Sequence, residues 1–142
     1  MFDLNHLHPM IVHFPIALIV VGFLFELFYL LYKKETCLSK TGLYLMVLGT
    51  LGAIAAYLTG EFFTSDLTGE AGKAQETHEL LALITMSAMI VATLLRGYLI
   101  WKKKEATNLR WVVFSLYALG ALMVGATGYL GGSLVYNYLI GL

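Results

Sequence analysis

The chain has 142 residues, its nine basic and nine acidic side chains balance to a formal charge of zero, and 59% of its residues are hydrophobic. A soluble domain is typically about 45 to 50% apolar, so this composition and a mean hydropathy of +0.78 indicate an integral membrane protein. The balanced charge offers no reason to expect a nucleic-acid partner, and the length suits one domain, residues 1–142.

The first apolar run covers about residues 10–32 and is long enough to span a bilayer. No basic region precedes it and no small-residue cleavage site follows it, so we expect the run to remain as a helix rather than to be removed as a signal peptide. It contains one acid, Glu26, and begins beside a group of histidines.

Three further apolar runs cover about residues 41–63, 79–101 and 111–138. The connections before the second and fourth runs are basic and hold seven of the nine Lys and Arg residues, whereas the connection at 64–77 is acidic. Short loops rich in Lys and Arg stay on the cytoplasmic side of a membrane. The pattern predicts an all-α, up-and-down bundle of four membrane helices with both termini outside.

The two halves of the chain resemble each other. An interval of 70 residues relates the first run to the third, and a similar echo relates the second run to the fourth. The matched residues are His8 with His78, Glu26 with Arg96, and Thr59 and Gly60 with Thr127 and Gly128. These matches suggest two duplicated helical hairpins related by an axis along the membrane normal, and sites tend to form where such halves meet.

Glu26 and Arg96 are predicted to lie at matching depth, each roughly 9 Å from the inner end of its helix. Two interpretations remain open. One is an interhelical ion pair that relieves the cost of burying two charges, and the other is a charge relay.

All four histidines, His6, His8, His13 and His78, belong to the outer third of the predicted bundle. A histidine inside a bilayer needs a partner or a ligand, so these residues are candidates for a site. We interpret His6 as an interfacial residue in water. His13 and His78 are the preferred pair, with His8 as a substitute or a hydrogen-bonding neighbour.

The relative direction of His8 and His13 depends on the local backbone. On a regular helix their side chains would point about 140° apart. Pro9 suits a first helical position and Pro15 removes a backbone bond, so the stretch from His8 to Pro15 is predicted to be kinked or only partly helical. Such a kink would let the two rings converge.

Two histidines on parallel helices are what axial coordination of a haem iron requires. Gly60 and Gly128 belong to rows of small residues that would flank a porphyrin, although ordinary packing between membrane helices uses the same pattern. Cys37 is the sole cysteine, so neither an internal disulfide nor a covalent haem motif can form. Any haem would be b-type.

A second hypothesis is a copper or zinc site built from His8, His13 and His78 with Glu79 or Met10, in a transporter or metal-handling protein. A third is a structural subunit that only holds a partner in the bilayer. No enzyme motif is evident, which favours an electron carrier or binding protein over a catalyst. The small-residue faces could also mediate homo-oligomer formation.

Three segments carry a resemblance to a known family. They are residues 8–18 (HPMIVHFPIAL), Thr77-His78-Glu79 with residues 81–85, and residues 127–136 (TGYLGGSLVY). The chain resembles, from end to end, the bacterial membrane family catalogued as domain of unknown function 2231. Its layout is similar to that of small b-type cytochromes.

The resemblance implies a multi-pass protein of the bacterial inner membrane, in which the outside termini predicted from the loop charges would be periplasmic. It also implies a respiratory electron-transfer context, with a cytochrome c, a Rieske-type protein or a quinone as partner. Carried over by position, the family's histidines correspond to His8, His13 and His78, and its closing motif to Gly131, Gly132 and Tyr136.

Overall fold

The computed structural model describes residues 7–32 and 36–139, and within these ranges every regular element is helical. The elements are α1 (Leu7–Ile11), α2 (His13–Leu31), α3 (Thr36–Phe63), α4 (Gly69–Trp101), α5 (Leu109–Leu134) and the π-helix η2 (Val135–Leu139). The stretches His8–Leu31, Thr36–Phe63, Gly69–Trp101 and Leu109–Tyr138 are long and apolar enough to cross a membrane. The predicted all-α four-helix membrane bundle is confirmed.

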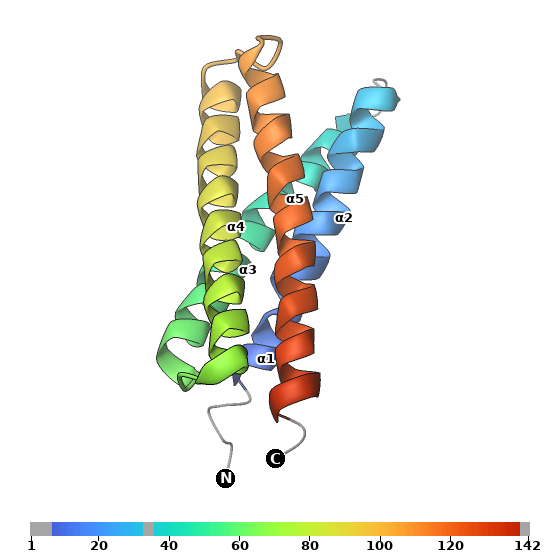
Figure 1. Cartoon of the computed structure of the whole chain (residues 1–142). Helices are drawn as coiled ribbons and strands as arrows, with labels where there is room; N and C mark the ends of the chain where they lie inside the picture. The colour runs from blue at the N-terminus through green and yellow to red at the C-terminus, as the bar shows by residue number, and fades with distance from the viewer. Residues whose placement is uncertain (1–6, 33–35, 140–142) are drawn as a thin grey trace.

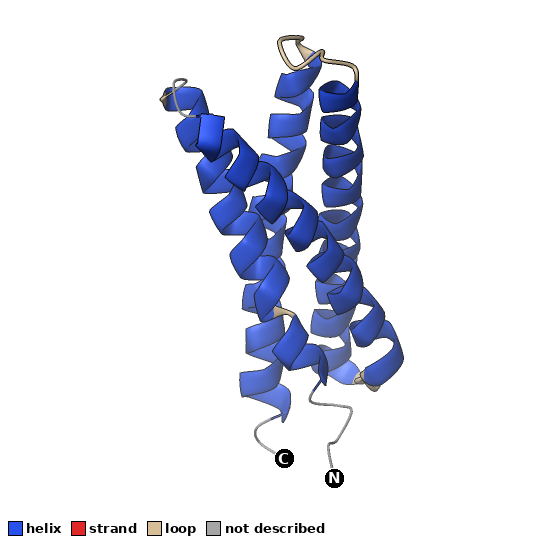
Figure 2. Cartoon of the chain, turned by 180° about the vertical axis from the view of Figure 1, so that it is seen from behind, coloured by secondary structure: helices blue, strands red, loops and turns tan. Residues whose placement is uncertain are grey.

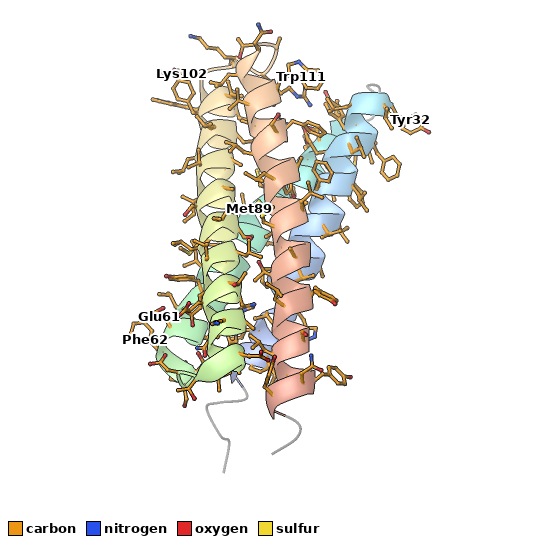
Figure 3. All side chains as sticks on the ribbon, viewed as in Figure 1. Tyr32, Glu61, Phe62, Met89, Lys102 and Trp111 are labelled. Atoms are coloured by element: carbon orange, nitrogen blue, oxygen red, sulfur yellow. The ribbon has the colours of Figure 1, made fainter. Side chains whose placement is uncertain are left out.

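The helices form two antiparallel hairpins, α2 with α3 and α4 with α5 (Figure 1). We call the end that holds α1, the start of α4 and the end of α5 the histidine end, and the opposite end, with the 102–108 connection, the basic end. Seen from both sides, the first hairpin is inclined to the second and leans away from it at the basic end (Figures 1 and 2). Figure 3 shows Met89 midway along the bundle, Glu61 and Phe62 near the histidine end, and Tyr32, Lys102 and Trp111 near the basic end.

The first membrane span is interrupted at Val12, between α1 and α2. Pro15 has no N–H to donate to the carbonyl of Ile11, so the regular pattern of helix hydrogen bonds stops there. The backbone stays hydrogen-bonded across the break, because the Val12 N–H bonds the His8 carbonyl at 3.1 Å and the Ile16 N–H bonds the Val12 carbonyl at 3.4 Å. The predicted irregularity between His8 and Pro15 is therefore present.

α4 begins ten residues earlier than predicted, at Gly69 instead of Glu79. Hydropathy marks only the apolar part of a helix, whereas the segment after Gly69 is rich in Glu, Ala, Lys and Gln, which are good helix formers. Thr68 is extended and Gly69 has φ of +69°, a conformation that glycine adopts without strain. Most of the predicted acidic loop is therefore helical. α3 likewise starts at Thr36 rather than at residue 41.

Burial follows the internal repeat. Each buried position of α2 has a buried counterpart in α4 at the predicted interval of 70 residues, namely Pro15 with Thr85, Ile19 with Met89, Gly22 with Ala92 and Glu26 with Arg96. The return helices match at an interval of 71, namely Gly42 with Val113, Met46 with Tyr117, Gly49 with Gly120 and Ala53 with Val124. The sequence-based match of Thr59 and Gly60 with Thr127 and Gly128 is thus displaced by three residues.

Glycines in α3 allow it to approach α2 closely. A Cβ added at Gly49 would lie 2.7 Å from Cγ1 of Ile19 and 3.2 Å from its backbone nitrogen. Ile19 itself is fully buried. Small residues have this role at membrane helix interfaces, where packing replaces the hydrophobic effect as the driving force.

We expect Gly49→Ala to destabilise the bundle by about 1 to 3 kcal/mol, because the new methyl group overpacks the interface between α2 and α3. Gly125→Ala is the matched control, since nothing lies within 4 Å of a Cβ added at this helical glycine. Unfolding of both variants in mixed micelles measures the difference. Equal stability of the two variants would contradict the close approach.

Candidate functional site

Two histidine rings from different hairpins face each other at the histidine end. His8 lies in α1 and His78 in α4, and both side chains are half-buried. Their ring centroids are 6.2 Å apart and their planes are perpendicular. The residues matched by the interval of 70 therefore meet where the two halves of the bundle meet.

Thr59 fixes the hydrogen bonding of His8. The Thr59 hydroxyl donates its only proton to the Ala56 carbonyl at 3.0 Å and lies 3.2 Å from Nδ1 of His8. With the hydroxyl proton directed to Ala56, the His8 Nδ1–H is the donor in that second bond, and in the neutral ring Nε2 keeps its lone pair.

His78 has the same tautomer by a different route. Its Nδ1 lies 3.0 Å from the main-chain carbonyl of Thr127. A carbonyl can only accept, so Nδ1–H is the donor and Nε2 is again free of its proton. Second bonds of this kind commonly orient histidine ligands and set their tautomer.

Glycines lie against both rings. A Cβ added at Gly60 would be 3.0 Å from Cε1 of His8, and one added at Gly131 would be 3.0 Å from Cε1 of His78. The predicted Gly128 has another role, since its Cβ would meet Cδ1 of Ile16 at 2.9 Å. Gly131, which the resemblance implied, is thus the glycine at the His78 ring.

Two cavities adjoin the pair of rings, and both are lined by His8 and His78. The first has a volume of about 290 Å³, and its exposed lining residues, His13, Gly132 and Tyr136, belong to α2, α5 and η2. The second has a volume of about 260 Å³ and reaches the α3–α4 connection. The lining of both is mainly apolar. The histidine pair thus lies between a space beside α2 and α5 and a space at the surface of the histidine end.

The ring opposite His78 belongs to His8, the predicted substitute, and not to His13, the predicted first choice. His13 is exposed, and its Nδ1–H donates to the Pro9 carbonyl at 2.8 Å. His8 and His13 both line the first cavity, but the Nδ1 of each ring lies against a different partner. His13 still lines the first cavity, with Gly128, Gly131, Gly132 and Tyr136. His6 lies outside the described residues.

The three-histidine metal site of the second hypothesis is not formed. Over residues 7–32 and 36–139, no three His, Cys, Asp or Glu side chains lie where they could hold one ion. Glu79 accepts a hydrogen bond from Gln75 at 2.9 Å, and Met10 is exposed. Two imidazoles are what the described part of the chain offers at this point.

A second polar cluster lies toward the basic end. Glu26 Oε1 is 3.7 Å from Nη1 of Arg96 and 3.0 Å from Nη2 of Arg110. Arg96 also donates to the Ser39 hydroxyl at 2.7 Å and lies 3.4 Å from the half-exposed Glu105. The predicted ion pair between Glu26 and Arg96 is present, and no observation bears on the charge relay.

Arg110 was missed as a partner of Glu26 because the sequence placed it in a loop. The repeat held the missing signal, since Ser39 and Arg110 are separated by the same 71 residues that relate α3 to α5. Glu26 bonds Arg110 from the other hairpin, and its counterpart Arg96 bonds Ser39 from the other hairpin. The cluster therefore repeats the symmetry of the histidine pair.

Residues 5–142 match the family described as predicted membrane protein (DUF2231), and the chain belongs to this family. The resemblance noted in the sequence is therefore confirmed, together with its membrane character. Neither the curated proteins nor the solved structures contain a match to the chain.

We expect Glu26→Gln to destabilise the protein by about 3 to 5 kcal/mol, because the buried Arg96 and the half-buried Arg110 lose the buried carboxylate that they share. Arg96 Nη1 and Arg110 Nε already lack hydrogen-bond partners. Glu105→Gln, which removes the exposed partner of the same Arg96, should cost less than about 1 kcal/mol. Denaturation of both variants in detergent measures the two changes in the free energy of unfolding. Similar changes would show that the buried carboxylate contributes no more to stability than the exposed one.

Proposed function

We propose that this protein is a small membrane b-type haem protein that transfers electrons near the histidine end, and that His8 and His78 would hold the iron. The observation that carries the proposal is the pair of neighbouring imidazoles. In each ring the Nδ1–H donates to a threonine, Thr59 or Thr127, and Nε2 carries no proton. Neutral imidazole nitrogen is a good ligand for iron.

The separation of the rings supports one metal between them. With metal–nitrogen bonds of about 2.0 Å, one ion held by both imidazoles would leave their ring centroids roughly 6 Å apart. The observed centroid distance is 6.2 Å.

The number of ligands favours haem over zinc. Two histidines complete the coordination of a haem iron, because the porphyrin supplies the other four nitrogens, whereas zinc sites use three or four protein ligands. The mainly apolar cavities of about 290 and 260 Å³ beside the rings provide space next to the gap. Gly60 and Gly131 let the two rings pack directly against α3 and α5.

A bound haem would supply one-electron chemistry. The residues of this chain would hold it, set the direction of both ligands and limit the access of water. The basic residues between α4 and α5 favour a cytoplasmic basic end. The histidine end would then face the periplasm of a bacterial inner membrane, where a cytochrome c, a Rieske-type protein or a quinone would exchange electrons.

The test is a reduced-minus-oxidised spectrum of the purified protein with haem quantification. We expect one haem per chain in the native protein, and loss of at least half of it in both His8→Ala and His78→Ala. His13→Ala should retain the haem, because that ring is exposed and bonds the Pro9 carbonyl four residues earlier in the chain. A colourless protein with stoichiometric copper or zinc, or haem that depends on His13 instead of His8, would overturn the proposal.

A further inference from the structure

The two facing histidines are mounted differently. His78 belongs to α4, an uninterrupted helix of 33 residues, whereas His8 belongs to α1, which has five residues and ends at the break before Val12. The Nδ1–H of His78 bonds a main-chain carbonyl, which no side-chain substitution removes. The Nδ1–H of His8 bonds a side-chain hydroxyl.

We infer that Thr59 is the positioning residue for His8: its hydroxyl holds the ring with Nε2 free to coordinate, and His8 is the exchangeable one of the two ligands. The inference rests on the proposed function. It names the residue that decides whether the second coordination position is occupied by the protein or open to an added small ligand.

The surroundings of Thr59 suit this role. The residue is buried, with 9% of its surface exposed, so water does not compete for its hydroxyl. Because its proton goes to the Ala56 carbonyl, the oxygen presents a lone pair to His8. The next residue, Gly60, lies against the edge of the same ring. One turn of α3 thus determines both the tautomer and the place of the His8 ring.

The two rings do not hold each other in place. His8 and His78 form no hydrogen bond with each other, since both rings use Nδ1–H elsewhere and neither has a second proton. The break at Val12 leaves α1 with less helical support than a continuous span. Loss of one hydroxyl should therefore affect the His8 side selectively.

The experiment compares Thr59→Val, which keeps the shape and removes the hydroxyl, with Thr59→Ser, which keeps the hydroxyl. In haem-free protein, ¹⁵N NMR of histidine should report the Nδ1–H tautomer at His8 in the native chain and in T59S. In T59V it should report a mixture of tautomers at His8 and no change at His78.

In haem-loaded protein, carbon monoxide binding to the reduced form measures how often the His8 position is open. We expect the association rate to rise about tenfold in T59V, which corresponds to the loss of one hydrogen bond of ordinary strength. T59S should remain within about twofold of the native rate, because the hydroxyl is retained. Equal rates in T59V and the native protein would overturn the inference.

The two readouts separate this inference from the proposed function. If the native protein takes up no added haem, the proposed function fails, and the NMR measurement still decides the role of Thr59. If haem binds through His8 and His78 but T59V behaves as the native protein does, only the role of Thr59 fails. Should T59V not fold, an Nε2–H tautomer at His8 in the native chain would overturn the role by itself.

Discussion

A polar side chain that enters a membrane-spanning bundle must find its partner inside the protein, because lipid offers none. This constraint governs the interior of the bundle. Its buried polar residues are Glu26, Thr50, Thr59, Thr85 and Arg96. The threonines donate to carbonyls of their own helices, and Thr50 also bonds Thr93 across the two hairpins at 2.8 Å. The charged pair meets its partners where the hairpins join.

The buried polar groups find their partners in different ways at the two ends of the contact between the hairpins. At the basic end the polar contacts cross between hairpins, as Glu26 bonds Arg110 and Arg96 bonds Ser39. At the histidine end each hairpin satisfies its own ring, so the two imidazoles face each other with no bond between them. A metal bound by both rings would connect the two hairpins at this end. The proposed function would therefore also stabilise the contact between the hairpins.

The internal repeat explains how much of the site could be predicted. The interval of 70 residues paired His8 with His78 and Glu26 with Arg96, and both pairs meet in the structure. The return helices follow an interval of 71, so Gly131 rather than Gly128 lies at the His78 ring. Arg110 and the first turns of α4 escaped prediction because both lie in polar segments, where hydropathy carries no signal for a helix.

The sequence by itself determined the four spans, the membrane character and the side-by-side arrangement of the halves. The free energy of transfer into lipid adds up over about 20 neighbouring residues. It can therefore be estimated from each segment of the sequence without knowledge of the tertiary structure. Only the tertiary structure decided that His8 and not His13 faces His78. That choice depends on the short helix that carries His8, on a hydroxyl 51 residues away and on two glycines that leave room for the rings. Each contact is weak and joins residues far apart in the sequence. Which histidine lies opposite His78 is therefore decided only when the hairpins pack together.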